Sequence, residues 1–212
     1  MQLTIFGASG KTGRHLVQQA LAAGHTVTAV VRDPARLPMR HDRLQVATAD
    51  VLDPAAIQPA VVEADAVISA LGPRSYRQAS SIISAGTASI LAAMRAAGTS
   101  RVVVISAAPV ASDHHGTTLP YRLLVGPMLR ALLRRGYADM AVMEEAIRRS
   151  GTDWTILRPP RLTNGPRTGT WRQARDANLR RGYRISRADL ADAILASLHD
   201  PDTVKATIAI GY

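Results

Sequence analysis

A glycine turn between an apolar strand and a helix constrains the fold of this chain more than any other feature. Residues 3–17 read LTIFGASGKTGRHLV, in which an apolar run enters a turn with Gly7, Gly10 and Gly13 and continues as a helical pattern. The first N–H groups of a helix have no internal partners, and the helix dipole places about half a positive charge at that end. Glycines also let an anion approach the backbone closely. The turn therefore predicts a site for a diphosphate.

The spacing of this turn differs from two common phosphate-binding motifs. Its glycines follow the pattern G-x-x-G-x-x-G rather than G-x-G-x-x-G. Gly10-Lys11-Thr12 looks like the end of a nucleotide-triphosphate loop, but that motif needs a glycine where Ile5 stands. The stretch is therefore interpreted as the strand, turn and helix that open a dinucleotide site.

Downstream of the turn, short apolar strands alternate with helices. Strands are predicted at 3–6, 25–31, 44–47, 66–69, 101–105, 154–157 and 205–210, and helices at 14–23, 35–37, from Asp53-Pro54, and at 80–97, 138–149 and 186–198. The strand at 101–105 is so continuously apolar that both of its faces must be covered, as in a parallel sheet. The pattern predicts an α/β fold with an open, doubly wound parallel sheet, whose ligands bind at the carboxyl ends of the strands.

All 212 residues are assigned to one domain, because no long linker or repeat interrupts the alternation. Residues 161–184 are rich in glycine, arginine and threonine and are interpreted as a substrate-side segment, with short strands near 169–172 and 182–185. The hydrophobic content of 47% and mean hydropathy of +0.01 indicate a soluble globular chain without a membrane span. The chain starts directly in a strand, which leaves no room for a signal peptide, and it has no cysteine. These features predict a cytoplasmic protein.

The formal charge of +10 raises the question of a nucleic-acid partner. Almost all of this charge is arginine spread along the chain, with lysine only at Lys11 and Lys205. No helix-turn-helix, zinc finger or aromatic RNA platform accompanies it, so no nucleic-acid binding is predicted. The adjacent His114 and His115 lack further ligands at a suitable spacing, and no metal site is predicted. The oligomeric state stays open between monomer and homodimer.

The residue that ends the second strand of a dinucleotide fold selects between the two nicotinamide cofactors. An acidic residue there accepts hydrogen bonds from the ribose 2′-hydroxyl, whereas this strand ends in Val31-Arg32. A guanidinium can hold a 2′-phosphate through two charge-assisted bonds, and Arg36 or Lys11 can add to the clamp. Asp33 precedes a proline and is interpreted as a helix cap. The sequence thus favours NADP(H) over NAD(H), the alternative being that Arg32 is a solvated residue at a strand end.

The ends of the other strands should line the same crevice. Asp50 and Val51 follow the third strand and are expected to face the adenine. Small residues follow the fourth strand, where the ribose and diphosphate pass: these are Ala70, Leu71 and Gly72. The ends of the fifth and sixth strands should reach the nicotinamide, and they carry Ser106, Ala107, Pro159 and Arg161.

With these residues assembled, the chain resembles the atypical short-chain dehydrogenase/reductases of the NmrA-like group, and within that group the NADPH-dependent flavin and biliverdin reductases. The matching stretches are GASGKTGRHLV, VVRDP, ADVLD, AVISALG, VVVIS and SGTDWTILRPPRLT. They cover nearly the whole chain and thin out at 112–136 and after Thr163. The resemblance implies a single-domain Rossmann-like fold.

The resemblance also implies roles for individual residues. The diphosphate would be bound by Gly7, Ala8, Ser9, Gly10, Lys11, Thr12 and Gly13. Ser106 and Arg161 match the positions that face the substrate, although the flavin and biliverdin reductases carry a histidine where this chain has Arg161. The wider superfamily uses a tyrosine followed by a lysine four residues on. Here Tyr76, Tyr121, Tyr137 and Tyr183 are followed at that offset by Ser80, Val125, Ala141 and Arg187.

Hydride transfer to a conjugated ring needs little acid catalysis, which suits a chain without the Tyr–Lys pair. The expected function is therefore an NADPH-dependent reductase of a flavin, quinone or similar small acceptor, with a flavin as substrate rather than bound cofactor. In this reaction Ser106 would orient the reactants or relay a proton, and Arg161 would attract an anionic acceptor or stabilise developing charge. The same two residues also fit structural roles, as a strand-end cap and an ion-pair partner. The alternative function is an NADP(H)-binding redox sensor of the NmrA type without turnover.

Overall fold

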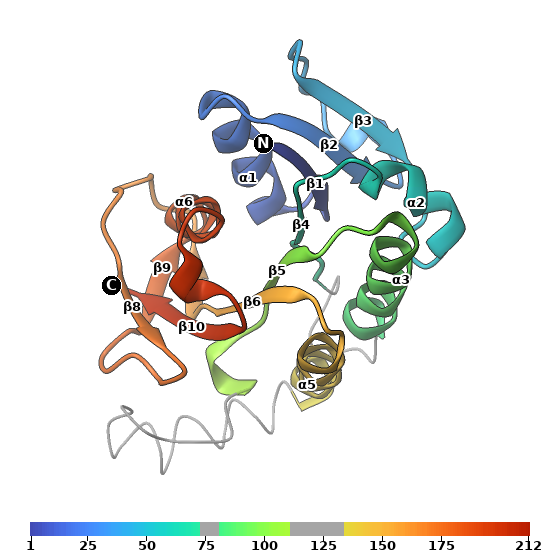
Figure 1. Ribbon diagram of the computed structural model, residues 1–212. Helices are drawn as coiled ribbons and strands as arrows, with labels where there is room; N and C mark the ends of the chain where they lie inside the picture. The colour runs from blue at the N-terminus through green and yellow to red at the C-terminus, as the bar shows by residue number, and fades with distance from the viewer. Residues whose placement is uncertain (73–80, 111–133) are drawn as a thin grey trace.

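The computed structural model describes residues 1–72, 81–110 and 134–212, which form an α/β structure built on one large sheet (Figure 1). The interpretations of Tyr76, Tyr121, His114 and His115 fall outside these residues. The large sheet has the strand order β3-β2-β1-β4-β5-β6-β10-β8. Its parallel strands are β1 (Gln2–Phe6), β2 (Thr26–Val31), β3 (Leu44–Thr48), β4 (Ala66–Ser69), β5 (Arg101–Ile105), β6 (Asp153–Arg158) and β10 (Ala206–Gly211).

Helices cover both faces of this sheet, as the apolar strand at 101–105 requires. On one face lie α1 (Lys11–Ala22) and α6 (Arg187–Ser197), and on the other lie α2 (Pro54–Val61), α3 (Ile82–Ala97) and α5 (Arg134–Arg149) (Figure 1). Within β5 the buried side chains alternate, since Val103 packs with α1 and α6 while Val102 and Val104 pack with α2, α3 and α5. The predicted doubly wound, Rossmann-like fold is confirmed.

Aspartate and serine side chains fix several helix starts. Asp53 Oδ1 accepts hydrogen bonds from two N–H groups at the start of α2, and Ser186 Oγ accepts one at the start of α6. Asp33 caps η1 (Pro34–Arg36), which is the role that its position before a proline predicts. α3 is capped from a distance: Asp139 on α5 accepts from Ile83 N at 3.0 Å and Ser84 N at 3.1 Å. This contact fixes α3 against α5.

The substrate-side segment differs in detail from the sequence prediction. Its strands lie at β8 (Arg172–Arg175) and β9 (Arg184–Ser186), a few residues beyond the predicted positions, and a third strand, β7 (Arg161–Thr163), was not predicted. β8 runs antiparallel to β10 at the edge of the large sheet, and β7 pairs with β9 in parallel as a separate small sheet. β7 has only three residues after a double proline, so it carries too little alternation to be recognised.

Candidate functional site

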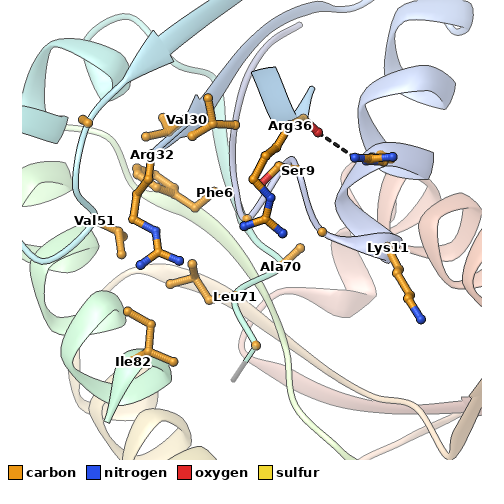
Figure 2. Close-up of a pocket in the computed structure, with 16 residues that line it drawn as sticks. Phe6, Ser9, Lys11, Val30, Arg32, Arg36, Val51, Ala70, Leu71 and Ile82 are labelled. Carbon is orange, nitrogen blue, oxygen red and sulfur yellow. Dashed lines mark hydrogen bonds between the residues drawn. The ribbon is translucent and has the colours of Figure 1, made fainter. Parts of the chain in front are cut away.

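A cavity of about 570 Å³ opens at the carboxyl ends of β1, β2, β3 and β4 (Figure 2). The strand order reverses at β1, and open α/β sheets bind their ligands at such a reversal. The cavity is lined by Phe6, Gly7, Ser9, Gly10, Lys11, Arg14, Val30, Val31, Arg32, Arg36, Ala49, Val51, Ala70, Leu71, Gly72 and Ile82.

The glycine turn forms one wall of the cavity, and its geometry requires residues without a Cβ atom at two positions. Gly7 has a φ of +73°, and a Cβ there would lie 2.5 Å from the Ala70 carbonyl oxygen. A Cβ on Gly13 would lie 2.1 Å from the Gly7 carbonyl oxygen. These two glycines therefore let the turn close against the end of β4 and let α1 pack against the turn. Gly10 donates its N–H to Gly7 O at 2.9 Å and lines the cavity itself.

The N-terminus of α1 opens into this cavity. Its N-cap residue is Gly10, and no side chain of the described residues caps it, in contrast to the starts of α2 and α6. The main-chain donors of its first turn are therefore directed at the space lined by Ser9, Gly10 and Lys11. A phosphate fits such a terminus through the N–H groups and the positive end of the helix dipole.

Four cationic side chains and no acidic one belong to the cavity lining among the described residues: Lys11, Arg14, Arg32 and Arg36. Figure 2 shows the Arg32 and Arg36 guanidinium groups reaching into the same space, while Lys11 points away from them in this view. Arg14 donates to the Arg36 carbonyl oxygen at 2.7 Å, and Asp33 accepts from Ala35 N at 3.0 Å. These two bonds hold the short turn that carries Arg36 at the mouth of the cavity.

The structure brings most of the predicted dinucleotide contacts together, with some exceptions. Nine of them line the cavity: Gly7, Ser9, Gly10, Lys11, Arg32, Val51, Ala70, Leu71 and Gly72. Ala8, Thr12 and Gly13 belong to the turn and first helical turn but not to the lining, and Ala8 and Gly13 are buried. Asp50 also lies outside the lining, and its carboxylate accepts the N–H of Leu52 at 3.0 Å.

Several lining residues are not among the predicted contacts. Phe6, Val30, Ala49 and Ile82 are apolar residues at or near element ends, where a sequence cannot separate a cavity wall from the core. Arg14 was also missed, although its place one turn into α1, next to the glycine turn, is a usable signal.

A second polar cluster, centred on a buried carboxylate, lies where β5, β6 and α5 meet. Glu144 is 1% exposed, and Arg158 donates to both of its oxygens at 2.9 and 2.6 Å. Ser106 is 2% exposed and donates from Oγ to Glu144 Oε1 at 2.5 Å. Arg148, one turn along α5, completes the set with a bond of 2.8 Å. A buried carboxylate is thus satisfied by two arginines and a hydroxyl.

The charge state of Glu144 follows from these partners. Burial alone would raise the pKa of its carboxyl, but the hydrogen bonds and charge of Arg158, with the hydrogen bonds from Ser106 and Arg148, outweigh burial and lower the pKa. Glu144 is therefore ionised at neutral pH. Because Ser106 gives its only hydroxyl proton to this carboxylate, its Oγ retains only lone pairs for other partners.

The remaining predicted residues lie around the same strand ends but outside the cavity lining. Ser106 N donates to Leu157 O at 2.8 Å and Ala108 N donates to Pro159 O at 2.9 Å, so the chains after β5 and β6 stay paired. Ala107 is half-buried, Pro159 is buried and Arg161 is exposed. On α5, Tyr137 is half-buried and is followed four residues later by Ala141.

The described residues offer neither a cluster of metal ligands nor a membrane-spanning helix. None of their His, Asp and Glu side chains gather in groups of three that could hold a metal ion. None of their helices has the length and apolar character needed to cross a membrane.

Comparison with known proteins supports a dinucleotide site. A family model of NAD(P)H-binding proteins matches residues 7–201. A 3-diazoavenalumate denitrifying reductase from Streptomyces is 30% identical over 225 residues, which cover 99% of this chain and 71% of that protein.

Two solved structures share the fold. A short-chain dehydrogenase/reductase from Veillonella parvula, in complex with NADP, superposes with a TM-score of 0.83 at 21% identity, covering 100% of this chain and 94% of that one. ChuY, an anaerobilin reductase from Escherichia coli O157:H7, gives 0.79 at 22% identity, covering 99% and 96%. The glycine turn at a strand-order reversal, the uncapped helix and the family match agree, and the chain belongs to the NAD(P)H-binding family, with a Rossmann-like fold.

Proposed function

We propose that this protein is an NADPH-dependent reductase that delivers hydride to a small conjugated acceptor such as a flavin, a quinone or a linear tetrapyrrole. The observation that carries the proposal is the cavity at the carboxyl end of β1, with an uncapped helix N-terminus at one side and two guanidinium groups at the other. The Streptomyces relative, a reductase, supports the same class of reaction.

The cavity residues would hold the dinucleotide by its phosphates. The main-chain donors at Ser9 and Lys11 suit the diphosphate, because the glycine turn leaves the backbone accessible. Arg32 and Arg36 suit the 2′-phosphate, because both reach the cavity and no acidic residue of the described lining competes with it. These charges favour NADPH over NADH.

The acceptor end of the site would lie at the ends of β5 and β6. In the sheet order, β6 is three strands from β1, which corresponds to about 14 Å at the usual strand spacing. When bound, the nicotinamide supplies the hydride, so the protein mainly has to hold donor and acceptor in contact. Ser106 suits an orienting role, since its hydroxyl group donates to Glu144 and its lone pairs stay free to accept a ligand N–H. Arg161 is exposed and suits an anionic acceptor.

A redox sensor that binds NADP(H) without turnover is the second candidate. It is favoured by the burial of Ser106 and by the alanine at position 141, four residues after Tyr137, since neither position supplies an exposed proton donor.

The two candidates separate in one experiment. NADPH is titrated against the protein, and its oxidation is then followed with FMN, dichlorophenolindophenol and menadione. Saturable binding with oxidation well above the uncatalysed rate supports the reductase. Saturable binding with no acceptor reduced supports the sensor, and no saturable binding refutes both.

The role of Arg32 is tested by Arg32→Gln. Loss of a charge-assisted contact to phosphate should weaken NADPH binding about 10- to 100-fold, while NADH binding changes less than about threefold. Arg40→Gln is the matched control, because Arg40 is exposed, lies nearby in the chain and is not part of the cavity lining. Equal losses for the two cofactors would remove Arg32 from this role.

A further inference from the structure

Arginines dominate the segment that follows the double proline. Residues 161–184 contain seven arginines and a single acidic residue, Asp176. Two of these arginines have carboxylate partners, since Arg167 pairs with Asp192 and Arg175 with Asp176. The other five, which we call the arginine rim, form no ion pair with a described carboxylate and are exposed: Arg161, Arg172, Arg180, Arg181 and Arg184.

The fold gathers these five residues although they are spread along the segment. Arg161 in β7 stands directly opposite Arg184 in β9. Arg172 donates to Arg180 O at 3.1 Å and to Tyr212 O at 2.6 Å, which ties the loop before β9 to the end of β10. The three residues Arg172, Arg180 and Arg181 line a hollow of about 340 Å³. Arg181 has a φ of +59°, in the left-handed region that non-glycine residues seldom adopt.

The arginine rim lies at the β10–β8 edge of the large sheet, next to the proposed acceptor site at the ends of β5 and β6. A Cβ on Gly211, the last residue of β10, would meet Gly182 at 3.2 Å and Pro160 at 3.4 Å. The loop that carries Arg180 and Arg181 is therefore packed beside the double proline that follows β6. β10 is four strands from β1, or about 19 Å, so the rim is separate from the dinucleotide cavity and lies beyond the expected position of the nicotinamide.

Five like charges in one region repel one another, and a hollow lined by one sign of charge concentrates small counter-ions. A guanidinium matches a phosphate or carboxylate through two parallel hydrogen bonds. We propose that the arginine rim is a second anion site, which binds a phosphate or carboxylate carried by the hydride acceptor. The identification of the ligand as a hydride acceptor rests on the proposed reductase function. The binding of an anion by the rim does not depend on that function.

The hollow favours a small molecule over a nucleic acid. Its volume lies at the lower end of the range of about 300–1,000 Å³ that is typical of small-molecule pockets. An acceptor that enters from this side would place its anionic group on the rim and its conjugated ring toward the ends of β5 and β6. The rim would thus select among acceptors by charge, while the strand ends position the ring for hydride transfer.

The test uses two pairs of ligands that differ only in their anionic groups. FMN is compared with riboflavin, and a linear tetrapyrrole dicarboxylate with its dimethyl ester, by equilibrium binding without nicotinamide cofactor. The proteins are the wild type, Arg180→Gln/Arg181→Gln, and Arg40→Gln/Arg95→Gln as a control that removes the same charge from exposed positions outside the rim.

The wild type and the control should bind the anionic member of at least one pair about tenfold or more tightly than the neutral member. The rim variant should lose most of this preference, keep its affinity for the neutral member and bind NADPH as the wild type does. Equal binding within both pairs by the wild type overturns the proposal. A charge preference that survives in the rim variant also overturns the proposal. The proposal is likewise overturned if the rim-dependent affinity is confined to DNA or RNA oligonucleotides.

The outcome is separable from that of the proposed function. NADPH binding and oxidation are measured on the same three proteins. If NADPH is not bound but the charge preference is lost in the rim variant, the reductase proposal fails and the anion site stands. If NADPH is bound and oxidised but no charge preference exists, the anion site fails alone.

Discussion

The double proline after β6 separates two arginines with opposite environments. Arg158 precedes it with a side chain only 17% exposed, and it forms a two-bond contact with the buried Glu144. Arg161 directly follows the double proline, is exposed and has no carboxylate partner among the described residues. The sequence RPPR gives no reason to distinguish them, yet one belongs to the interior and the other to the arginine rim.

This contrast shows two uses of arginine in one strongly basic chain. Arginines such as Arg158 and Arg101 are used inside the protein, where they satisfy a carboxylate or main-chain carbonyl groups. The charge of Arg158 is balanced by Glu144, whereas the arginines of the cavity and the rim have no carboxylate partner among the described residues. Mutations should separate the two groups by whether they change stability or binding.

The largest effect is expected for Glu144→Gln. Removal of this charge leaves Arg158 without its carboxylate in a largely buried position, which typically costs about 3–5 kcal/mol. Urea denaturation measures the change, and the matched control is Glu145→Gln, because Glu145 is exposed and pairs with a largely exposed arginine on the same helix. If the variant does not fold, Glu144→Gln/Arg158→Met should recover part of the loss. Equal effects at 144 and 145 would contradict the role of the cluster.

The pH dependence of stability should report the same cluster. The folded-state pKa of Glu144 is lowered from its ordinary value, so its contribution is complete above that value and is lost as the pH falls through the folded-state pKa. Wild-type stability should therefore decline below about pH 4.5, and the decline should be shallower in Glu144→Gln. Asp189, whose pKa is also lowered, adds to the decline in both proteins. Parallel pH profiles of the two proteins would argue against an ionised Glu144.

A smaller loss is expected for Arg101→Gln. Arg101 donates to Asp153 O at 2.8 Å and to Ser197 O at 2.9 Å, which connects β5 and β6 with the end of α6. Hydrogen bonds from a charged donor contribute about 1.5–3 kcal/mol. The expected result is a lower midpoint of thermal unfolding with an unchanged affinity for NADPH. If the variant instead changed the affinity for NADPH and kept the wild-type stability, Arg101 would belong to the arginines that act in binding.

The smallest change in stability is expected for Arg161→Gln, within about 0.5 kcal/mol of the wild type. Its effect should appear in binding, as a several-fold loss of affinity for an anionic acceptor. Thr163→Ser is a suitable control in the same short strand. A stability loss comparable with that of Arg101→Gln would mean that Arg161 has an internal partner.

The sequence predicts the parts of this molecule that depend on local patterns. The order of strands and helices follows from periodicity and caps, as at Asp53 and Ser186. The glycine turn locates the cavity, because strand order brings the ends of β1, β2 and β4 together. The cavity lining includes Arg32, which was singled out by its place at the end of β2.

Features that depend on contacts between distant residues escaped prediction. Glu144 and Glu145 are adjacent glutamates in the same helix, and the local sequence does not show which of them is buried. Only the fold brings Glu144 to Ser106 and Arg158. Asp139 caps a helix more than fifty residues away, which no local motif indicates. For Asp50 the prediction placed the residue correctly after β3. It did not indicate that the carboxylate accepts a hydrogen bond within a local turn.

The uncapped start of α1 is a feature through which the proposed ligand would affect the stability of the native state. In the proposed function, a dinucleotide whose phosphate oxygens accept the first-turn N–H groups would act as the cap that this helix lacks among the described side chains. By mass action such a ligand stabilises the native state by about 2.7 kcal/mol at a hundred times its dissociation constant. If the proposed dinucleotide binds there, the ligand-free protein should unfold at a lower temperature and be cleaved faster by proteases than the ligand-bound protein.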